Sequence, residues 1–178
     1  MSETPATRGS FADLLPRLLS GLAMAVIGVL VVLQGGAVMI FVVAAAVYVM
    51  VWELARICGS GEPHVFGAAA GVSCLFVLLL PEGYGLPFLM LPAFLRIARL
   101  HTFRVVFAVF TVLIQLSAYG LVRVRDDFGA EWMGWLMLVV IVTDVAGYFA
   151  GRIIGGPKFW PRVSPKKTWS GTLAGWIS

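Results

Sequence analysis

The chain has 178 residues, of which 60% are hydrophobic and only 12% are charged, and its mean hydropathy is +0.95. A soluble domain carries about 25% charged residues. The composition therefore excludes an ordinary soluble globule and predicts a polytopic membrane protein. The net charge of +4 does not indicate nucleic-acid binding, because no polar domain combines basic and aromatic residues into a groove for nucleic acid. The basic residues are instead interpreted by their positions relative to the membrane.

Six apolar segments approach the roughly 20 residues that a membrane-spanning helix needs. We therefore predict an all-α, polytopic transmembrane helix bundle with about six spans and the start of a seventh near Ser178. Residues 1–17 are expected to form an N-terminal tail, and residues 18–178 the transmembrane domain. The fourth segment is short and contains Pro92, which is typical of a tilted span or a re-entrant piece. The predicted spans cover residues 18–33, 37–57, 65–80, 86–97, 103–122 and 132–154.

The basic residues are distributed unevenly between the two predicted sides of the membrane. Eleven of the 13 Lys and Arg residues fall in the N-terminal tail, two loops and the C-terminal segment, whereas Arg123 and Arg125 stand on the opposite side. Cytoplasmic loops carry an excess of Lys and Arg. Both the N-terminus and the basic C-terminal loop are therefore expected to be cytoplasmic, and the fourth segment is expected to cross.

One acid, Asp144, lies in the middle of the sixth predicted span. Residues four apart share a helix face, so Asp144, Tyr148 and Arg152 form a polar stripe. A structural Asp–Arg pair is one interpretation, but eight residues rise about 12 Å, which is too far without an intermediary. A carboxylate within a membrane is costly, and we favour a metal ligand or a substrate-positioning acid.

Small residues accompany this stripe. Gly147, Gly151 and Gly155 form a ridge that lets another helix or a ligand approach the backbone closely.

Glu53, in the second predicted span, is followed three residues later by Arg56, and a structural ion pair is the favoured interpretation.

The C-terminal loop contains the sequence Ser164-Pro165-Lys166-Lys167-Thr168. Ser is a good N-cap and Pro fits the first helical position, so a helix is predicted to begin here. Free N–H groups at a helix start attract anions, and the two lysines and the Thr hydroxyl strengthen such a site. A phosphate-binding site and a simple anchor on anionic lipid are both compatible with the pattern.

These two motifs resemble those of the phosphatidate cytidylyltransferase family, also called CDP-diacylglycerol synthases. The resemblance implies a membrane enzyme, in the inner membrane of a bacterium, that joins CTP and phosphatidic acid with the help of Mg²⁺. It also allows a homodimer. The matching residues are Asp144, Tyr148, Phe149, Gly151, Arg152 and Gly155 in the first motif and Pro161, Ser164, Pro165, Lys166, Lys167, Thr168 and Gly171 in the second.

The resemblance also implies roles for individual residues. Asp144 and Lys167 would be catalytic, and Asp144 is a candidate metal ligand. Tyr148 and Gly151 would line the site. Ser170 stands where the family usually has Glu. The residues implied to bind substrate phosphates are Arg152, Ser164, Lys166, Lys167 and Thr168.

The family's principal metal-binding motifs, a Lys-Asp pair, a His-Gly-Gly and an Asp-Arg-x-Asp, would follow Ser178. The sequence is therefore expected to be the N-terminal part of a longer enzyme. Two alternatives remain. One is a transporter or channel, although the halves show no convincing repeat and few intramembrane polar groups could line a pathway. The other is a non-catalytic membrane subunit.

Overall fold

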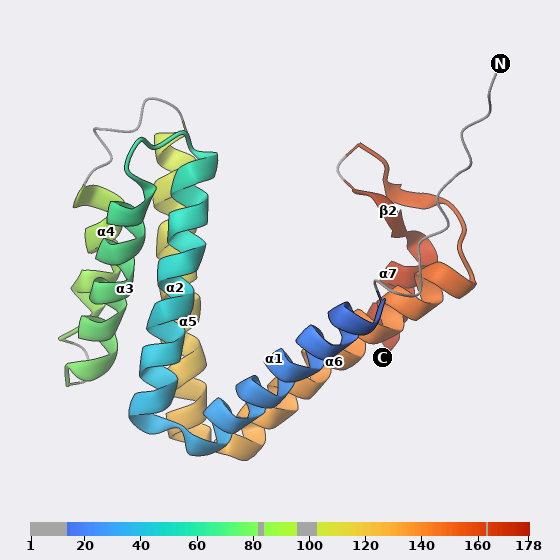
Figure 1. Cartoon of the computed structure of the whole chain (residues 1–178), viewed down its shortest axis with the longest axis horizontal. Helices are drawn as coiled ribbons and strands as arrows, with labels where there is room; N and C mark the ends of the chain where they lie inside the picture. The colour runs from blue at the N-terminus through green and yellow to red at the C-terminus, as the bar shows by residue number, and fades with distance from the viewer. Residues whose placement is uncertain (1–13, 82–83, 96–102, 163) are drawn as a thin grey trace. The chain divides into compact units, whose positions relative to one another are not determined.

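A computed structural model describes residues 14–81, 84–95, 103–162 and 164–178 of the chain. The chain divides into two compact units, Met1–Asp127 and Phe128–Ser178. The described residues are mostly helical, as the composition predicts, with a single two-stranded hairpin (Figure 1). The helical part of the predicted fold is confirmed, and the hairpin is an addition to it.

Long apolar stretches form the helices of the first unit, and glycine or proline separates them. Gly35 has a φ of +60°, which suits glycine, and it ends the first helix. Pro63 occupies the first turn of a later helix, where its missing N–H is no loss. The elements of this unit are α1 (Leu14–Gln34), α2 (Gly36–Ile57), α3 (Pro63–Leu79), the 3₁₀ helix η2 (Leu86–Met90), α4 (Leu91–Leu95) and α5 (Arg104–Phe128).

Among the residues that the structure describes, three helices are long and apolar enough to cross a membrane: α2, α5 and α6 (Ala130–Ile153). The apolar part of α1 and the whole of α3 are shorter. The fourth predicted span is η2 followed by the five-residue α4, so its described part is interrupted rather than continuous. A helical membrane-type fold is therefore supported, whereas the number of six spans is not established.

Helices α2 and α3 lie side by side (Figure 1), and small residues form the contact between them. A Cβ atom added to Gly67 would lie 2.8 Å from the carbonyl oxygen of Tyr48 and 2.9 Å from Cβ of Trp52. At Gly71 the nearest atom, the carbonyl oxygen of Ala44, would be 3.3 Å away. The absence of side chains at these positions lets the two helix backbones approach closely.

Buried polar side chains join α5 to α3 and η2. Gln115 is fully buried, and its Nε2 donates to Oγ of Ser73 at 3.3 Å. Ser73 in turn donates to the carbonyl oxygen of Phe88. Elsewhere between α3 and α5 the rings of Phe66 and Phe107 meet edge to face, with their centroids 5.0 Å apart. Hydrogen bonds between helices are worth roughly 1 kcal/mol in a bilayer, so this cluster helps to fix α5 against its neighbours.

Arg125 holds the end of α1. Its Nε donates to the carbonyl oxygen of Val32 at 3.1 Å, and its Nη2 to that of Leu33 at 3.3 Å. These carbonyls have no partner within the helix, and a basic side chain at a C-terminus satisfies them. This arginine therefore has a structural role.

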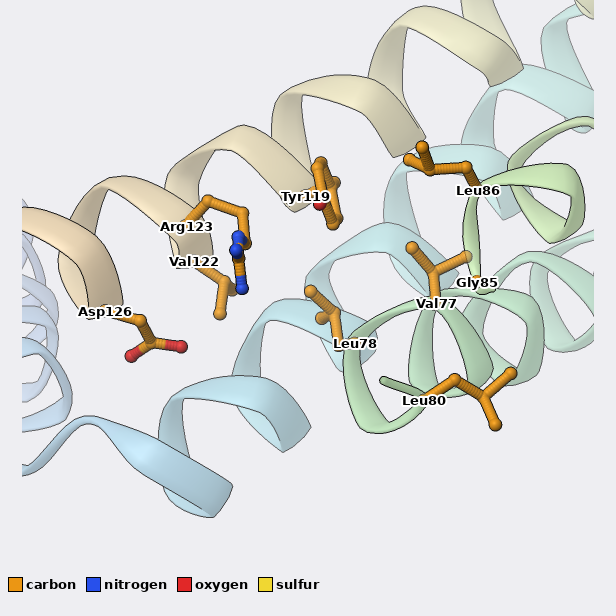
Figure 2. A pocket seen from close by; sticks show the side chains of 9 residues that line it. All are labelled: Val77, Leu78, Leu80, Gly85, Leu86, Tyr119, Val122, Arg123 and Asp126. Carbon is orange, nitrogen blue, oxygen red and sulfur yellow. The ribbon is translucent and has the colours of Figure 1, made fainter. Parts of the chain in front are cut away.

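A small pocket lies between α5 and the end of α3 (Figure 2). Its lining combines apolar side chains such as Val77 and Leu86 with the polar side chains of Arg123 and Asp126. Its Arg123 already pairs with Asp127 at 3.5 Å and lies over the ring of Tyr119, 5.9 Å from the centroid. Within the described part of the chain, none of the predicted site residues lines this pocket.

The predicted pair of Glu53 and Arg56 is confirmed, with Nη1 and Oε2 3.0 Å apart. His64 has partners that the sequence did not suggest. Its Nδ1 lies 3.0 Å from Oη of Tyr48, and its ring stacks on that of Trp52 with the centroids 5.2 Å apart.

The second unit contains one long helix, a hairpin and a short helix. After α6 the chain forms β1 (Lys158–Trp160) and β2 (Ser164–Thr168), which pair antiparallel, and then α7 (Trp169–Ile177). Gly155 and Gly156 have φ of +64° and +107°, and they turn the chain out of α6. Helix α7 runs back along α6 (Figure 1).

The α2–α3 interface leads to a first prediction. Gly67→Ala should lower the free energy of unfolding by about 1–3 kcal/mol, because its new methyl group meets backbone. Gly120→Ala is the matched control, because nothing lies within 4 Å of a Cβ there and alanine stabilises a helix by up to about 1 kcal/mol. Thermal unfolding in detergent measures both. Equal melting temperatures for the two variants would contradict the close approach.

Candidate functional site

An open groove of about 740 Å³ lies within the second unit, between α6, the end of β2 and α7. Its size is within the range of small-molecule sites, roughly 300–1,000 Å³. Polar side chains are present along its length together with glycine backbone. The residues that line it are Thr143, Asp144, Gly147, Tyr148, Gly151, Arg152, Lys167, Thr168, Gly171, Thr172, Gly175 and Trp176.

The polar stripe of α6 forms one wall of the groove. Nη1 of Arg152 donates to Oη of Tyr148 at 2.7 Å, so the tyrosine orients the guanidinium group. Among the residues that the structure describes, Asp144 has no ion-pair partner. The side chains of Asp144, Tyr148 and Arg152 are all exposed. The predicted stripe is confirmed, and its acid and base are both accessible to a ligand.

Glycines bring α6 and α7 together. A Cβ on Gly171 would lie 2.5 Å from the carbonyl oxygen of Gly147 and 3.2 Å from Cα of Gly151. A Cβ on Gly175 would lie 3.2 Å from the carbonyl oxygen of Thr143. The predicted ridge is therefore confirmed for two of its glycines as a helix contact. Gly155 is different, because nothing lies within 4 Å of a Cβ there.

The predicted helix start at Ser164 is wrong. Ser164 begins strand β2, where it pairs with Trp160, and the helix begins only at Trp169. The N-cap is Thr168, with φ −113° and ψ 157°, whose Oγ1 accepts the N–H of Gly171. Pairing with β1 holds Ser164 and its neighbours extended, and this overrides their local preference for a helix start.

The N–H groups at the start of α7 are not the main source of anion binding. At the real start of α7, the N–H of Trp169 donates to the carbonyl oxygen of Pro157 at 3.1 Å, and that of Gly171 to Thr168 at 3.3 Å. Two N–H groups of the first turn are thus already used. Attraction for an anion in the groove must come mainly from the side chains of Arg152 and Lys167.

The structure brings most of the predicted site residues together. Asp144, Tyr148, Gly151 and Arg152 of α6 face the same groove as Lys167 and Thr168 of β2. Ser164 does not line the groove. The side chain of Lys166 lies outside the part of the chain that the structure describes.

Sequence reasoning missed the part of the groove formed by α7. Thr172 and Trp176 lie four residues apart on this helix and both line the groove, and the spacing of Gly171 and Gly175 repeats that of the α6 glycines. This repeated small-residue spacing is the signal that could have identified the second wall.

Asp144 fits one part of a magnesium site. Mg²⁺ is usually held by one or two carboxylates together with substrate phosphates and water. Within the described ranges no group of three or more His, Cys, Asp or Glu residues could hold a metal by itself. Asp144 therefore suits a shared ion that a bound phosphate also ligates.

These features define a helical membrane-type protein with a cationic groove that contains one carboxylate. The chain belongs to the cytidylyltransferase family, whose model matches residues 15–178. No solved structure matches the chain.

Curated relatives match a shorter stretch. The phosphatidate cytidylyltransferase of Brucella suis is 51% identical over 61 residues, which is 33% of this chain and 23% of the relative. That of Helicobacter pylori is 42% identical over 57 residues, covering 32% of this chain and 21% of the relative. That of Mycobacterium bovis is 37% identical over 54 residues, covering 30% and 18%. The matched stretch thus spans less than a quarter of each of these relatives.

The glycine contact leads to a second prediction. Gly171→Ala should force α7 away from α6, because its methyl group would collide with the carbonyl oxygen of Gly147. Amide hydrogen exchange across α7 should then become faster. Gly134→Ala in α6 is the control, because nothing lies within 4 Å of a Cβ there. Unchanged protection of α7 in Gly171→Ala would show that the helices are not in such close contact.

Proposed function

We propose that the protein is a phosphatidate cytidylyltransferase, which converts CTP and phosphatidic acid into CDP-diacylglycerol and pyrophosphate. The observation that carries this proposal is the groove itself, where Asp144, Tyr148 and Arg152 face Lys167. Family membership and the names of the curated relatives agree with it. Together they favour this enzyme over a transporter or a non-catalytic subunit.

The groove suits the reaction because both substrates are anionic. A phosphate oxygen of phosphatidic acid forms a bond to the α-phosphorus of CTP, and the bond from that phosphorus to the departing pyrophosphate breaks. Charge accumulates on the transferring group and on the leaving group. Lys167 and Arg152 hold these phosphates, while Tyr148 keeps the guanidinium group of Arg152 in place.

Magnesium is part of the proposal. The ion would screen the negative charge of the phosphates, and Asp144 would be one of its ligands. The carboxylate of Asp144 would attract the positive ion, while the side chains of Arg152 and Lys167 would attract the negative phosphates.

The proposal includes an arrangement in the membrane. The apolar helices form about six spans and part of a seventh, and the N-terminus and the hairpin of β1 and β2 face the cytoplasm of a bacterium. Exposed apolar side chains cover most of the length of α6, as expected of a helix in contact with lipid or with further helices. A homodimer is compatible with this arrangement.

The third prediction concerns the lysine of the groove. Lys167→Ala should lower CTP-dependent turnover roughly 10²–10³-fold, because it removes a cation that stabilises the transferring phosphate, and leave membrane insertion intact. Lys158→Ala is the matched control, since Lys158 is exposed in the same hairpin but does not line the groove. The assay follows label from CTP into lipid, using protein expressed from the complete gene. Unchanged kinetics in Lys167→Ala would refute the assigned role.

The fourth prediction concerns the acid. Asp144→Asn should raise the Mg²⁺ concentration needed for half-maximal activity, because an amide is a weaker ligand than a carboxylate. Glu131→Gln, which changes an exposed acid of α6 outside the groove, should not. Titration of Mg²⁺ at fixed CTP measures both variants. An identical magnesium dependence in Asp144→Asn would exclude this carboxylate as a ligand.

A further inference from the structure

Three linked hydrogen bonds lie at the start of α7, and one of them reaches the chain just after the end of α6. Oγ of Ser170 donates to the carbonyl oxygen of Gly155 at 2.5 Å. Oγ of Ser170 also lies 3.0 Å from Oγ1 of Thr168. Oγ1 of Thr168 accepts the N–H of Gly171 at 3.3 Å. Gly155, which accepts the hydrogen bond from Ser170, has a positive φ and lies where the chain leaves α6.

The hydrogen atoms in this chain can be assigned by counting. A carbonyl oxygen can only accept, so Ser170 must use its single hydroxyl hydrogen on Gly155. Ser170 is then the acceptor in its contact with Thr168. The hydroxyl hydrogen of Thr168 therefore points to Ser170, while the N–H of Gly171 occupies one of the acceptor positions of Thr168. Thr168 is left without a hydrogen to give to a phosphate oxygen.

We propose that Thr168 and Ser170 are positioning residues, which form a hydroxyl chain that holds the neighbouring Lys167 toward the groove, and that the Thr168 hydroxyl does not donate to substrate. Thr168 is 6% exposed, whereas Lys167 beside it is exposed. The backbone bond from Trp169 to Pro157 ties the same two segments together. The hydroxyl chain and this bond close the loop that carries the hairpin.

In a Ser-Pro-Lys-Lys-Thr motif at a phosphate site, the Thr hydroxyl would ordinarily be expected to donate to phosphate. If Thr168 donated to phosphate, removing Ser170 would free its hydrogen, and binding would be unchanged or tighter. If the hydroxyl chain positions Lys167, removing either hydroxyl should weaken binding in the same way. Ser170→Ala thus separates the two roles.

The first measurement is amide hydrogen exchange, which does not depend on the proposed function. Thr168→Val and Ser170→Ala should each raise exchange at the start of α7, by roughly fivefold where one hydrogen bond is lost. The double variant should add little, because both changes break one connected chain. Thr168→Ser keeps the hydroxyl and should restore protection. Exchange at the original rate in both Thr168→Val and Ser170→Ala would overturn the hydroxyl chain.

The second measurement rests on the proposed function and uses equilibrium binding of labelled CTP to the protein in detergent. Thr168→Val and Ser170→Ala should each weaken binding several-fold, and Thr168→Ser should restore it. In a Lys167→Ala background, Ser170→Ala should cause no further loss, a result that general destabilisation would not give. Normal binding by Ser170→Ala, or a full additional loss in the Lys167→Ala background, would overturn the positioning role. Absence of CTP binding in the original protein would contradict the proposed function, and hydrogen exchange would still decide the hydroxyl chain.

Discussion

The groove depends on the contact between the glycines of α6 and α7. With the carbonyl oxygen of Gly147 only 2.5 Å from where a Cβ of Gly171 would stand, no other residue fits without a shift of the backbone. This contact places the end of β2 beside the polar stripe of α6. Lys167 and Thr168 can therefore face Arg152 from a different element. A larger side chain at the contact would separate the two walls and with them the charges.

The hairpin adds a second constraint, because α7 can approach α6 only if the chain between them is closed tightly. The left-handed glycines after α6 turn the chain. Ser170 and Trp169 then bond to the carbonyl oxygens of Gly155 and Pro157. The rings of Phe159 and Trp169 meet edge to face, with their centroids 4.7 Å apart, and support the same junction. Local contacts thus fix the backbone on both sides of the hairpin, which is the basis for the proposed positioning of Lys167.

The sequence was most informative where a periodic pattern decided the structure. The spacing of Asp144, Tyr148 and Arg152 predicted their common face, because four residues make about one turn of a helix. The same rule predicted the Glu53–Arg56 pair. The prediction of a helix start at Ser164, which rested on the local preferences of Ser and Pro, failed because pairing with β1 determines the conformation there. Propensity describes only a residue's neighbours in sequence, whereas β2 owes its shape to pairing with β1. The wall of the groove that α7 forms was missed for a related reason. The contact partners of Gly171 lie on another helix, α6, and its sequence neighbours do not reveal them.

The charged groups of the two units differ in how they are used. In the first unit Arg56, Arg123 and Arg125 each have a carboxylate within 4.0 Å, and Arg125 also binds the end of α1. In the second unit, among the residues described, neither Asp144 nor Lys167 has an ion-pair partner. Charged groups in a membrane protein are costly and usually pair with one another. Charges that stay unpaired around an open groove are suited to a charged ligand, and this contrast is the physical reason to place the function in the second unit.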